Sequence, residues 1–396
     1  MQNGHLEAVP DRLFPFALQV DEFKQKCSRT TDKNTYPLAS CIEKNIPIYD
    51  VSKLEPLDPA KSSQLQNEWH HILYSGPGVL VLKNMYGSAQ LLSTANAVFQ
   101  KIIEQERQSA TAKGDHFAAS GNNDRIWNSF SKHGLEDAAS FVEYYSNPWL
   151  ALVSEAWLGP AYRVTAQVNI VKPGGAAQNS HRDYHLGFQN PERCAAYPRS
   201  LQIATQFLTL QGAVAHSDMP LETGPTRFLP FSQTYDAGFL AWRDEGFRAY
   251  FLENYVSLPI AMGDGVFFNP ALFHAAGANT SDPELAFHRK ANLLQISSAF
   301  SKTMETIDTV PLIDHCWELL LERYTKQRYT DVRCFVQAVA EGYPFPTNLD
   351  RRPPAPSGMA PESEQELIMR GLKEQWSREK VVEVLKQLQR DSHPSP

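Results

Sequence analysis

The stretch Asn-Ser-His-Arg-Asp-Tyr-His, residues 179–185, decides how this chain is interpreted. Successive side chains of an extended strand alternate between its two faces, so we expect His181 and Asp183 on one face and Arg182 on the other. An imidazole and a carboxylate on one face are two of the three ligands that hold non-haem Fe(II) and leave positions open for a co-substrate and O2. A second histidine on a later strand would complete this set.

The candidate for the third ligand is His274, which follows the apolar run 267–273 and precedes small residues that suit a tight turn. Arg289 opens another apolar run further along the chain. Its planar guanidinium can bind the distal carboxylate of 2-oxoglutarate through two parallel hydrogen bonds. A His-x-Asp triplet alone is a weak signal. Together with a distant histidine and a basic residue on the next strand, it predicts an Fe(II)/2-oxoglutarate-dependent oxygenase with metal ligands His181, Asp183 and His274.

From residue 163 to 300 the chain consists of short β-rich runs separated by glycine and proline, which is typical of a sandwich or barrel. The metal set favours a double-stranded β-helix, the jelly-roll or cupin core. We therefore predict an α+β fold in which helices flank this core on its N- and C-terminal sides. The expected strands are residues 163–171, 181–188, 201–214, 226–230, 256–261, 265–269 and 289–300.

Composition divides the chain into four predicted parts: an N-terminal extension over residues 1–45, an oxygenase domain over 46–345 with its core at about 163–300, a proline-rich linker over 346–362 and an amphipathic C-terminal helix over 363–396. The C-terminal helix either packs on its own core or mediates a homodimer. Both alternatives remain open on the sequence alone.

Four blocks carry a family resemblance: residues 172–183, 222–230, 263–279 and 289–291. In order and spacing they resemble the phytanoyl-CoA dioxygenase (PhyH) family of Fe(II)/2-oxoglutarate-dependent oxygenases, over roughly residues 76–300. The resemblance implies iron ligands at His181, Asp183 and His274, with Arg289 on the distal carboxylate of 2-oxoglutarate. Gln178 matches a position that contacts this co-substrate in fungal members. The family often has a hydroxyl residue where this chain has Ala276.

The activity that the resemblance implies is the oxidation of a small organic molecule by hydroxylation, desaturation or oxidative cyclisation, with release of succinate and CO2. Halogenating relatives carry a small residue at the position of Asp183, so this chain is expected to oxygenate or desaturate. A secondary metabolite is the favoured substrate because no basic cluster suits a coenzyme A diphosphate. The alternatives are an acyl-CoA 2-hydroxylase of the phytanoyl-CoA type and a jelly-roll enzyme with Zn or Ni chemistry, for which Arg289 would have no co-substrate to bind.

Further site residues follow from position. On the run 165–171, Gln167 and Asn169 alternate with apolar residues, so they either line the site and contact the co-substrate or form a solvated outer face. His216, in a polar loop, is expected to face solvent. Residues 111–128 are expected to form a loop over the site. The candidate substrate contacts at its opening are Arg125, Trp127, Tyr184, His185 and Phe188.

Overall composition excludes several classes of protein. The net charge is −7 and basic residues never cluster, which argues against nucleic-acid binding. No apolar run is long enough to cross a membrane. The five cysteines lack CxxC spacing, which disfavours zinc-finger and disulfide frameworks and favours a reducing compartment. We predict a cytoplasmic protein and leave a peroxisomal address near Arg12 open.

Overall fold

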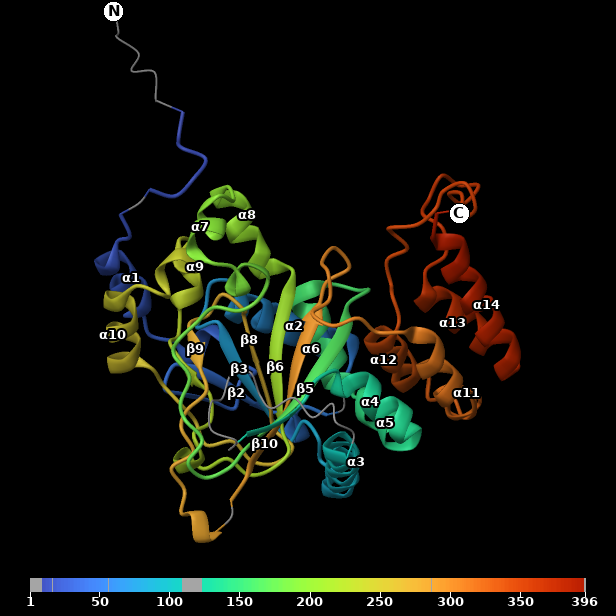
Figure 1. The fold of residues 1–396 in the computed structure, drawn as a ribbon, viewed down its shortest axis with the longest axis horizontal. Coiled ribbons are helices and arrows are strands. Elements are labelled where there is room, and N and C mark those ends of the chain that lie inside the picture. The colour runs from blue at the N-terminus through green and yellow to red at the C-terminus, as the bar shows by residue number, and fades with distance from the viewer. Residues whose placement is uncertain (1–8, 16, 56, 109–122, 286, 395–396) are drawn as a thin grey trace, which may run out of the picture.

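The computed structural model describes residues 9–15, 17–55, 57–108, 123–285 and 287–394. They form a mixed α+β fold around one large sheet, with helices packed along it (Figure 1). The strands are β1 (Cys41–Glu43), β2 (Ile46–Asp50), β3 (Val79–Lys83), β4 (Asn123–Ile126), β5 (Arg163–Val171), β6 (Thr209–Ala215), β7 (Arg227–Phe228), β8 (Gly265–Phe268), β9 (His274–Ala275) and β10 (Arg289–Ser297). The helices are α1 (Val20–Cys27), α2 (Pro59–Tyr74), α3 (Ala89–Gln108), α4 (Ser129–Glu136), α5 (Ala138–Tyr145), α6 (Pro148–Leu158), α7 (Pro191–Ala195), α8 (Arg199–Ala204), α9 (Gly238–Ala241), α10 (Glu245–Asn254), α11 (Thr309–Thr325), α12 (Tyr329–Val339), α13 (Glu364–Lys373) and α14 (Arg378–Ser392).

The large sheet has the strand order β1-β2-β3-β8-β6-β10-β5-β4. Its pairs are antiparallel except for β2 and β3, which are parallel. β10 pairs with β5 along its whole length, from Arg289 opposite Val171 to Ser297 opposite Arg163. On its other edge β10 pairs with β6. These long central strands give the sheet a rigid frame on which side chains of fixed register can be placed.

A smaller sheet lies across from the large one. β7 pairs with β9, and bridges extend this pair to His181 on one side and Val256 on the other. Backbone hydrogen bonds also join residues 174–183 to residues 270–279. The order across this sheet is therefore the segment 174–183, β9, β7 and the segment at Val256. The predicted strands 181–188 and 256–261 pair only at single bridges within the described structure.

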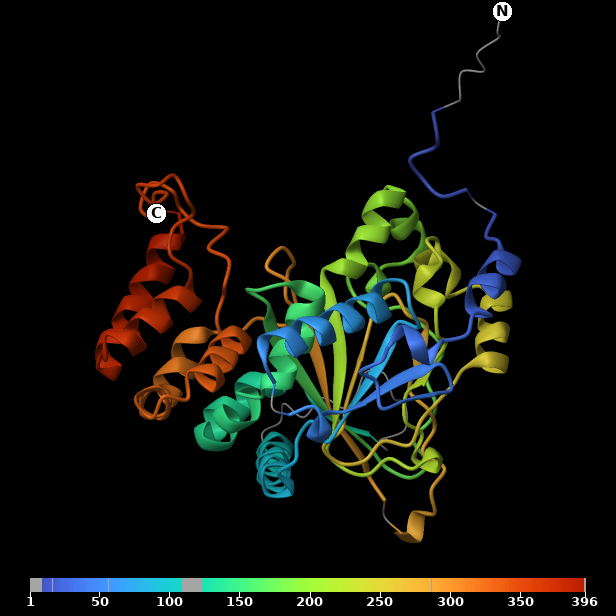
Figure 2. The ribbon, with the colours of Figure 1, turned by 180° about the vertical axis from the view of Figure 1, so that it is seen from behind.

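The large sheet has an apolar outer face and a polar inner face. Val164, Val168 and Leu294 point outward and belong to the main hydrophobic core, which also contains Trp69 and Trp317 from the helices. Helices α2, α4 and α6 pack on β3, β5 and β6, and Figure 2 shows α2 crossing this face. Because the apolar side chains are buried under helices, the alternate positions of the same strands are free to line a site between the two sheets.

The prediction of a strand over residues 201–214 is wrong in its first half. Residues 199–204 are helix α8 and residues 205–207 a 3₁₀ turn, so the strand begins only at Thr209. The extended run predicted over 181–188 likewise ends early, because residues 185–188 form a 3₁₀ turn. A Cβ at Gly187 would lie 2.2 Å from the carbonyl oxygen of Arg182, so the chain can turn back here only with glycine.

Two helices stand where the sequence predicts one at the C-terminus. α13 ends at Lys373 and α14 begins after Ser377, whose side chain caps it by accepting from the backbone N–H of Lys380. Gln375 between them has a φ of 54°, which a continuous helix does not allow. Leu372 and Leu385 join the main core, so the apolar faces of these helices pack on their own chain.

The N-terminal segment covers the small sheet. Phe23 of α1 is fully buried and its ring packs against Phe247 and against Phe273, the residue before His274. Of the predicted loop over residues 111–128, residues 111–122 lie outside the described structure, and Asn123–Ile126 form β4 on the edge of β5 instead. In the described ranges no helix has the length and apolar character that crossing a membrane requires.

Candidate metal centre

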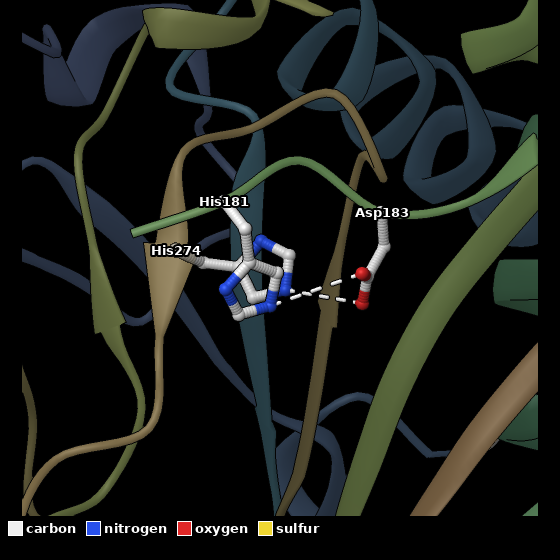
Figure 3. Close-up of side chains that lie close together, drawn as sticks. All are labelled: His181, Asp183 and His274. Carbon is white, nitrogen blue, oxygen red and sulfur yellow. Dashed lines mark ion pairs between the residues drawn. The ribbon is translucent and has the colours of Figure 1, made fainter. Parts of the chain in front are cut away.

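The side chains of His181, Asp183 and His274 point toward one another, with His274 on β9 and His181 on the segment bridged to it (Figure 3). One side-chain ligand atom from each lies within 4.8 Å of the others. His181 Nε2 is 3.8 Å from Asp183 Oδ1, and His274 Nε2 is 3.5 Å from Asp183 Oδ2. This arrangement of two imidazole nitrogens and a carboxylate fits the facial set of non-haem iron.

The alternation expected of the extended chain holds at Arg182. Its guanidinium points away from the other two side chains and donates hydrogen bonds to the carbonyl oxygens of Ser232 and Tyr235, at 2.7 and 2.8 Å. Arg182 is only 2% exposed, and this burial lowers its pKa to about 9. The residue between the two candidate ligands therefore anchors their segment to the loop that follows β7.

Backbone carbonyl groups orient both histidine rings. His181 Nδ1 lies 2.8 Å from the carbonyl oxygen of Asn179, and His274 Nδ1 lies 2.9 Å from that of Leu272. A carbonyl oxygen can only accept, so each ring donates its Nδ1–H and keeps the lone pair on Nε2. Both lone pairs then face Asp183, as a metal ligand set requires.

A glutamine from the large sheet holds the carboxylate. Gln211 on β6 donates from Nε2 to Asp183 Oδ2 at 2.7 Å. Burial alone would raise the pKa of Asp183, but the adjacent His181 and His274 and the hydrogen bond from Gln211 hold it well below its ordinary value. Burial lowers the pKa of His181. These shifts favour a carboxylate at Asp183 and a neutral imidazole at His181, which are the protonation states in which such ligands bind a metal.

The three side chains open into a cavity of about 680 Å³ between the two sheets. Gln167 and Asn169 of β5 line it, together with Gln211 and Leu293 from the neighbouring strands. The polar face of β5 therefore lines the cavity and does not form a solvated outer face. The apolar residues between them, such as Val168, are the ones under the helices.

Arg289 lines the same cavity and is 7% exposed. Its Nη1 donates to the carbonyl oxygens of Thr223 and Gly277, at 3.0 and 3.3 Å, and it has no carboxylate partner among the described residues. Burial lowers its pKa to about 10. Gln178 lines the cavity as well and exchanges two hydrogen bonds with Ala276, one through its own backbone N–H and one through Oε1. A buried guanidinium without a counter-ion suits the carboxylate of a co-substrate.

The predicted substrate contacts divide into two groups. Arg125 and Phe188 line the cavity. Trp127, Tyr184 and His185 are not among its described lining residues. The ring of Trp127 lies 4.8 Å from the Arg125 guanidinium, the Tyr184 hydroxyl donates to the Lys302 carbonyl at 3.2 Å, and His185 lies 3.3 Å from the hydroxyl of Thr209. The placement of these three residues gives their substrate role no support.

Two residues of the site were missed by sequence reasoning. Gln211 and Gln295 face the cavity from adjacent strands, as opposite partners in the pairing of β6 with β10. Each is a single polar residue inside an apolar run, a signal that alternation alone could have flagged. His216, expected to face solvent, is 2% exposed and bonded to Tyr144 and Asn96, so that prediction is wrong.

A large sheet with a His-Asp-His group that lines a cavity and could hold a metal ion is the arrangement expected of a metal-dependent enzyme. The model of the phytanoyl-CoA dioxygenase (PhyH) family matches residues 74–284, more than half of the chain. The chain therefore belongs to this family, and it is an oxygenase. The match includes His181, Asp183 and His274 and ends before Arg289.

The chain is also similar, at low sequence identity, to several solved structures. The α-ketoglutarate-dependent epimerase SnoN from nogalamycin biosynthesis is 17% identical, with 61% of this chain and 84% of that chain covered at a TM-score of 0.40. The carbocyclase SnoK of the same pathway is 18% identical, with 60% and 86% covered at 0.43. EvdMO1 is 15% identical, with 59% and 50% covered at 0.41. SnoN has also been solved with Fe3+, α-ketoglutarate and nogalamycin RO. No curated protein sequence matches the chain.

Proposed function

We propose that this protein is an Fe(II)/2-oxoglutarate-dependent dioxygenase that oxidises a small organic molecule of secondary metabolism and releases succinate and CO2. One observation carries the proposal. The ligand atoms of His181, Asp183 and His274 gather within 4.8 Å at a cavity that Arg289, a buried cation without a carboxylate partner in the described structure, also lines. A metal chelated by the keto acid and a guanidinium on its far carboxylate together account for both features.

We also propose that the two sheets form a double-stranded β-helix. Strands β5, β10, β6 and β8 are neighbours in the large sheet, and the segment at His181, β9, β7 and the segment at Val256 are neighbours in the small one. Along the chain the segments cross from one sheet to the other at every step except between β7 and the segment at Val256, which are consecutive and both lie in the small sheet. This order is the winding of a jelly roll. This arrangement supports the predicted fold class and explains why ligands distant in sequence face one cavity.

Each residue of the proposed site has a separate task. His181, Asp183 and His274 would hold Fe(II) with their backbone-oriented lone pairs. Arg289 would bind the distal carboxylate of 2-oxoglutarate, with Gln178, Gln167 and Asn169 around it. Together Fe(II), 2-oxoglutarate and O2 supply the oxidising equivalents for breaking a C–H bond.

Zn or Ni chemistry on the same ligands is the competing proposal, and Arg289 distinguishes the two. A hydrolase or isomerase would leave the buried guanidinium of Arg289 without an ionic partner. The distal carboxylate of 2-oxoglutarate would supply one. Hydroxylation, desaturation and oxidative cyclisation all begin with the same C–H cleavage. The organic substrate decides among them.

The test is consumption of 2-oxoglutarate in air by the purified protein. We expect succinate to form when Fe(II) is added, and none when Fe(II) is omitted or replaced by Zn(II). The variant Asp183→Ala should reduce succinate to the level of the metal-free protein. Succinate formation that is independent of Fe(II), or unchanged in Asp183→Ala, would overturn the proposal.

A further inference from the structure

One wall of the cavity carries amide side chains whose oxygens have no hydrogen-bond partner in the described structure. Gln211 Oε1 and Gln295 Oε1 lie on β6 and β10, at positions that face each other directly in the strand pairing. Asn169 Oδ1 and Asn123 Oδ1 lie further along, on β5 and β4. All four residues line the cavity. The wall thus contains four buried amide oxygens that no described group satisfies.

The orientation of the Gln211 amide follows from its neighbour. Only its NH2 group can donate to the carboxylate of Asp183, so the atom left without a partner is the oxygen. Gln211 is 3% exposed and Gln295 is 8% exposed. Buried acceptors are rarely left unsatisfied, because an unpaired polar atom forfeits its bonds to water. The oxygen of Gln211, which lies beside the Gln295 amide, therefore points to a ligand that donates a hydrogen bond next to Asp183.

The charged residues that line the cavity limit the class of ligand that can bind there. Among the described lining residues the cations other than histidine are Arg125, Arg182 and Arg289, and Asp183 is the only carboxylate. Arg182 is turned away toward backbone carbonyls, and Arg289 is assigned to 2-oxoglutarate. One arginine is too few for the phosphates of an acyl-CoA, which clustered cations recognise. The neighbouring part of the same wall is apolar: Val266 and Phe268 lie on β8 beside β6, and Phe268 is the pairing partner of Gln211.

We propose that the substrate is an uncharged, hydroxyl-bearing molecule, and that one of its hydroxyl groups donates to the paired amides of Gln211 and Gln295. The proposal rests on the proposed function and specifies its substrate class. Because Gln211 also holds Asp183, the carbon that carries this hydroxyl, or the carbon beside it, is brought next to the metal ligands. The apolar side chains of Val266 and Phe268 beside Gln211 then pack against the ring or chain of the molecule.

The experiment uses trans-cyclohexane-1,2-diol and its dimethyl ether as matched probes, since the ether keeps the shape and loses the donors. Binding is measured anaerobically by ligand-observed saturation-transfer NMR on the protein with Fe(II) and 2-oxoglutarate. Loss of a hydrogen bond to a buried acceptor corresponds to about tenfold in affinity. We expect the diol to bind about tenfold more tightly than the ether, and Gln295→Leu to remove this difference.

Two further variants control the result. Gln295→Met keeps the length of the side chain without its amide, and it replaces Gln295→Leu if the branched side chain disturbs folding. It should remove the difference between diol and ether in the same way. Gln100→Leu makes the same change on an exposed face of α3 and should leave diol binding unchanged. Equal binding of diol and ether to the wild-type protein, or tighter binding of hexanoyl-CoA than of the diol, would overturn the inference.

Failure of the inference is distinguishable from failure of the proposed function. Chelation of Fe(II) by 2-oxoglutarate gives a visible charge-transfer absorption that needs no substrate. If this absorption forms in the wild-type protein but the diol binds no better than the ether, only the substrate class is wrong. If the absorption does not form, the proposed function fails.

Discussion

At the scale of single residues, Arg289 offers the sharpest test of co-substrate binding. Its guanidinium is buried among carbonyl oxygens, so a bound carboxylate would be its only ionic partner in the described structure. Replacing a charged, bidentate hydrogen-bond donor costs roughly 1.5–3 kcal/mol. We predict that Arg289→Gln weakens 2-oxoglutarate binding by roughly 10- to 100-fold, with a smaller loss for Arg289→Lys, which keeps the charge.

Anaerobic calorimetry with 2-oxoglutarate on the iron-loaded protein measures this effect. The affinity for Fe(II) should be the same in both variants, because Arg289 is not a ligand. If Arg289→Gln bound 2-oxoglutarate as tightly as the wild-type protein, the carboxylate would have to bind elsewhere.

Gln211 supports a different prediction, which concerns the metal itself. Its 2.7 Å hydrogen bond orients the carboxylate of Asp183. Removal of such a supporting partner typically costs roughly 10- to 100-fold in metal affinity. We expect Gln211→Leu to lower Fe(II) affinity within this range, as measured by titration against a competing chelator. Retention of full affinity would mean that the two histidines alone orient the metal.

Local alternation explains which residues could be predicted. His181, Arg182 and Asp183 take the faces that a strand dictates, because two residues of extended chain suffice to set them. Gln211 could not be assigned, since its role depends on an opposite sheet that the sequence does not reveal. His216 was misplaced for the same reason: its polar neighbours in sequence indicated solvent, while α3 and α5 bury it.

At the scale of elements, the two C-terminal helices extend the main core. Trp317 Nε1 of α11 donates to the carbonyl oxygen of Trp376 between α13 and α14, at 2.9 Å. Leu385 of α14 is fully buried. We predict that Leu385→Ala lowers the free energy of unfolding by about 2–5 kcal/mol, because it leaves a cavity against α11.

Chemical denaturation with urea measures this loss. Lys386→Ala, the neighbouring exposed position on the same helix, should change the free energy of unfolding by no more than about 0.5 kcal/mol. A similar small effect of Leu385→Ala would show that α14 is only loosely attached to the core.

Helices and strands with a long, regular pattern of apolar residues were predicted well, whereas short elements were not. Residues 89–106 and 163–171 carry long, regular patterns, and the structure has a helix and a strand there. The segment 201–208 has strand-like composition but follows Pro198, and a buried Gln202 that donates to the carbonyls of Cys194 and Tyr197 stabilises it as a helix. Such tertiary contacts override weak local preference.

At the scale of the whole molecule, two buried histidines behind the large sheet predict sensitivity to acid. His133 and His216 are 0% and 2% exposed, and burial lowers their pKa values to about 4 and about 3. Asp137 lies near His133, whereas His133 itself and Lys290 lie near His216 and lower its pKa further. In the unfolded chain both should titrate near about 6.5. Below that pH the unfolded state binds more protons than the folded state, so stability falls as the pH falls.

Each histidine should contribute a loss of about 1.4 kcal/mol per pH unit between about pH 6 and pH 4. Urea unfolding at several pH values measures the slope. We predict that His216→Gln reduces this slope by about 1.4 kcal/mol per pH unit, which corresponds to one proton. The loss of stability that comes from buried carboxylates remains in both proteins. An unchanged slope would mean that His216 is protonated in the folded state.

The closure of two sheets around one cavity is the property that the sequence least reveals. His274 and Arg289 could be proposed only because a metal set and a family resemblance linked them to Asp183. The substrate wall depends on the register of β6, β10 and β5, which no local pattern encodes. The homodimer and the cytoplasmic location stay predictions, and the apolar face of α14 is already buried by its own chain.

The most direct test of the central claim is an anaerobic titration of the purified protein with Fe(II) and then with 2-oxoglutarate, followed by its visible absorption. The account predicts one Fe(II) and one 2-oxoglutarate per chain, with charge-transfer absorption that Asp183→Ala abolishes and that Arg289→Gln shifts to higher 2-oxoglutarate concentration. No absorption in the wild-type protein, or equal absorption in Asp183→Ala, would contradict an Fe(II)/2-oxoglutarate site at His181, Asp183 and His274.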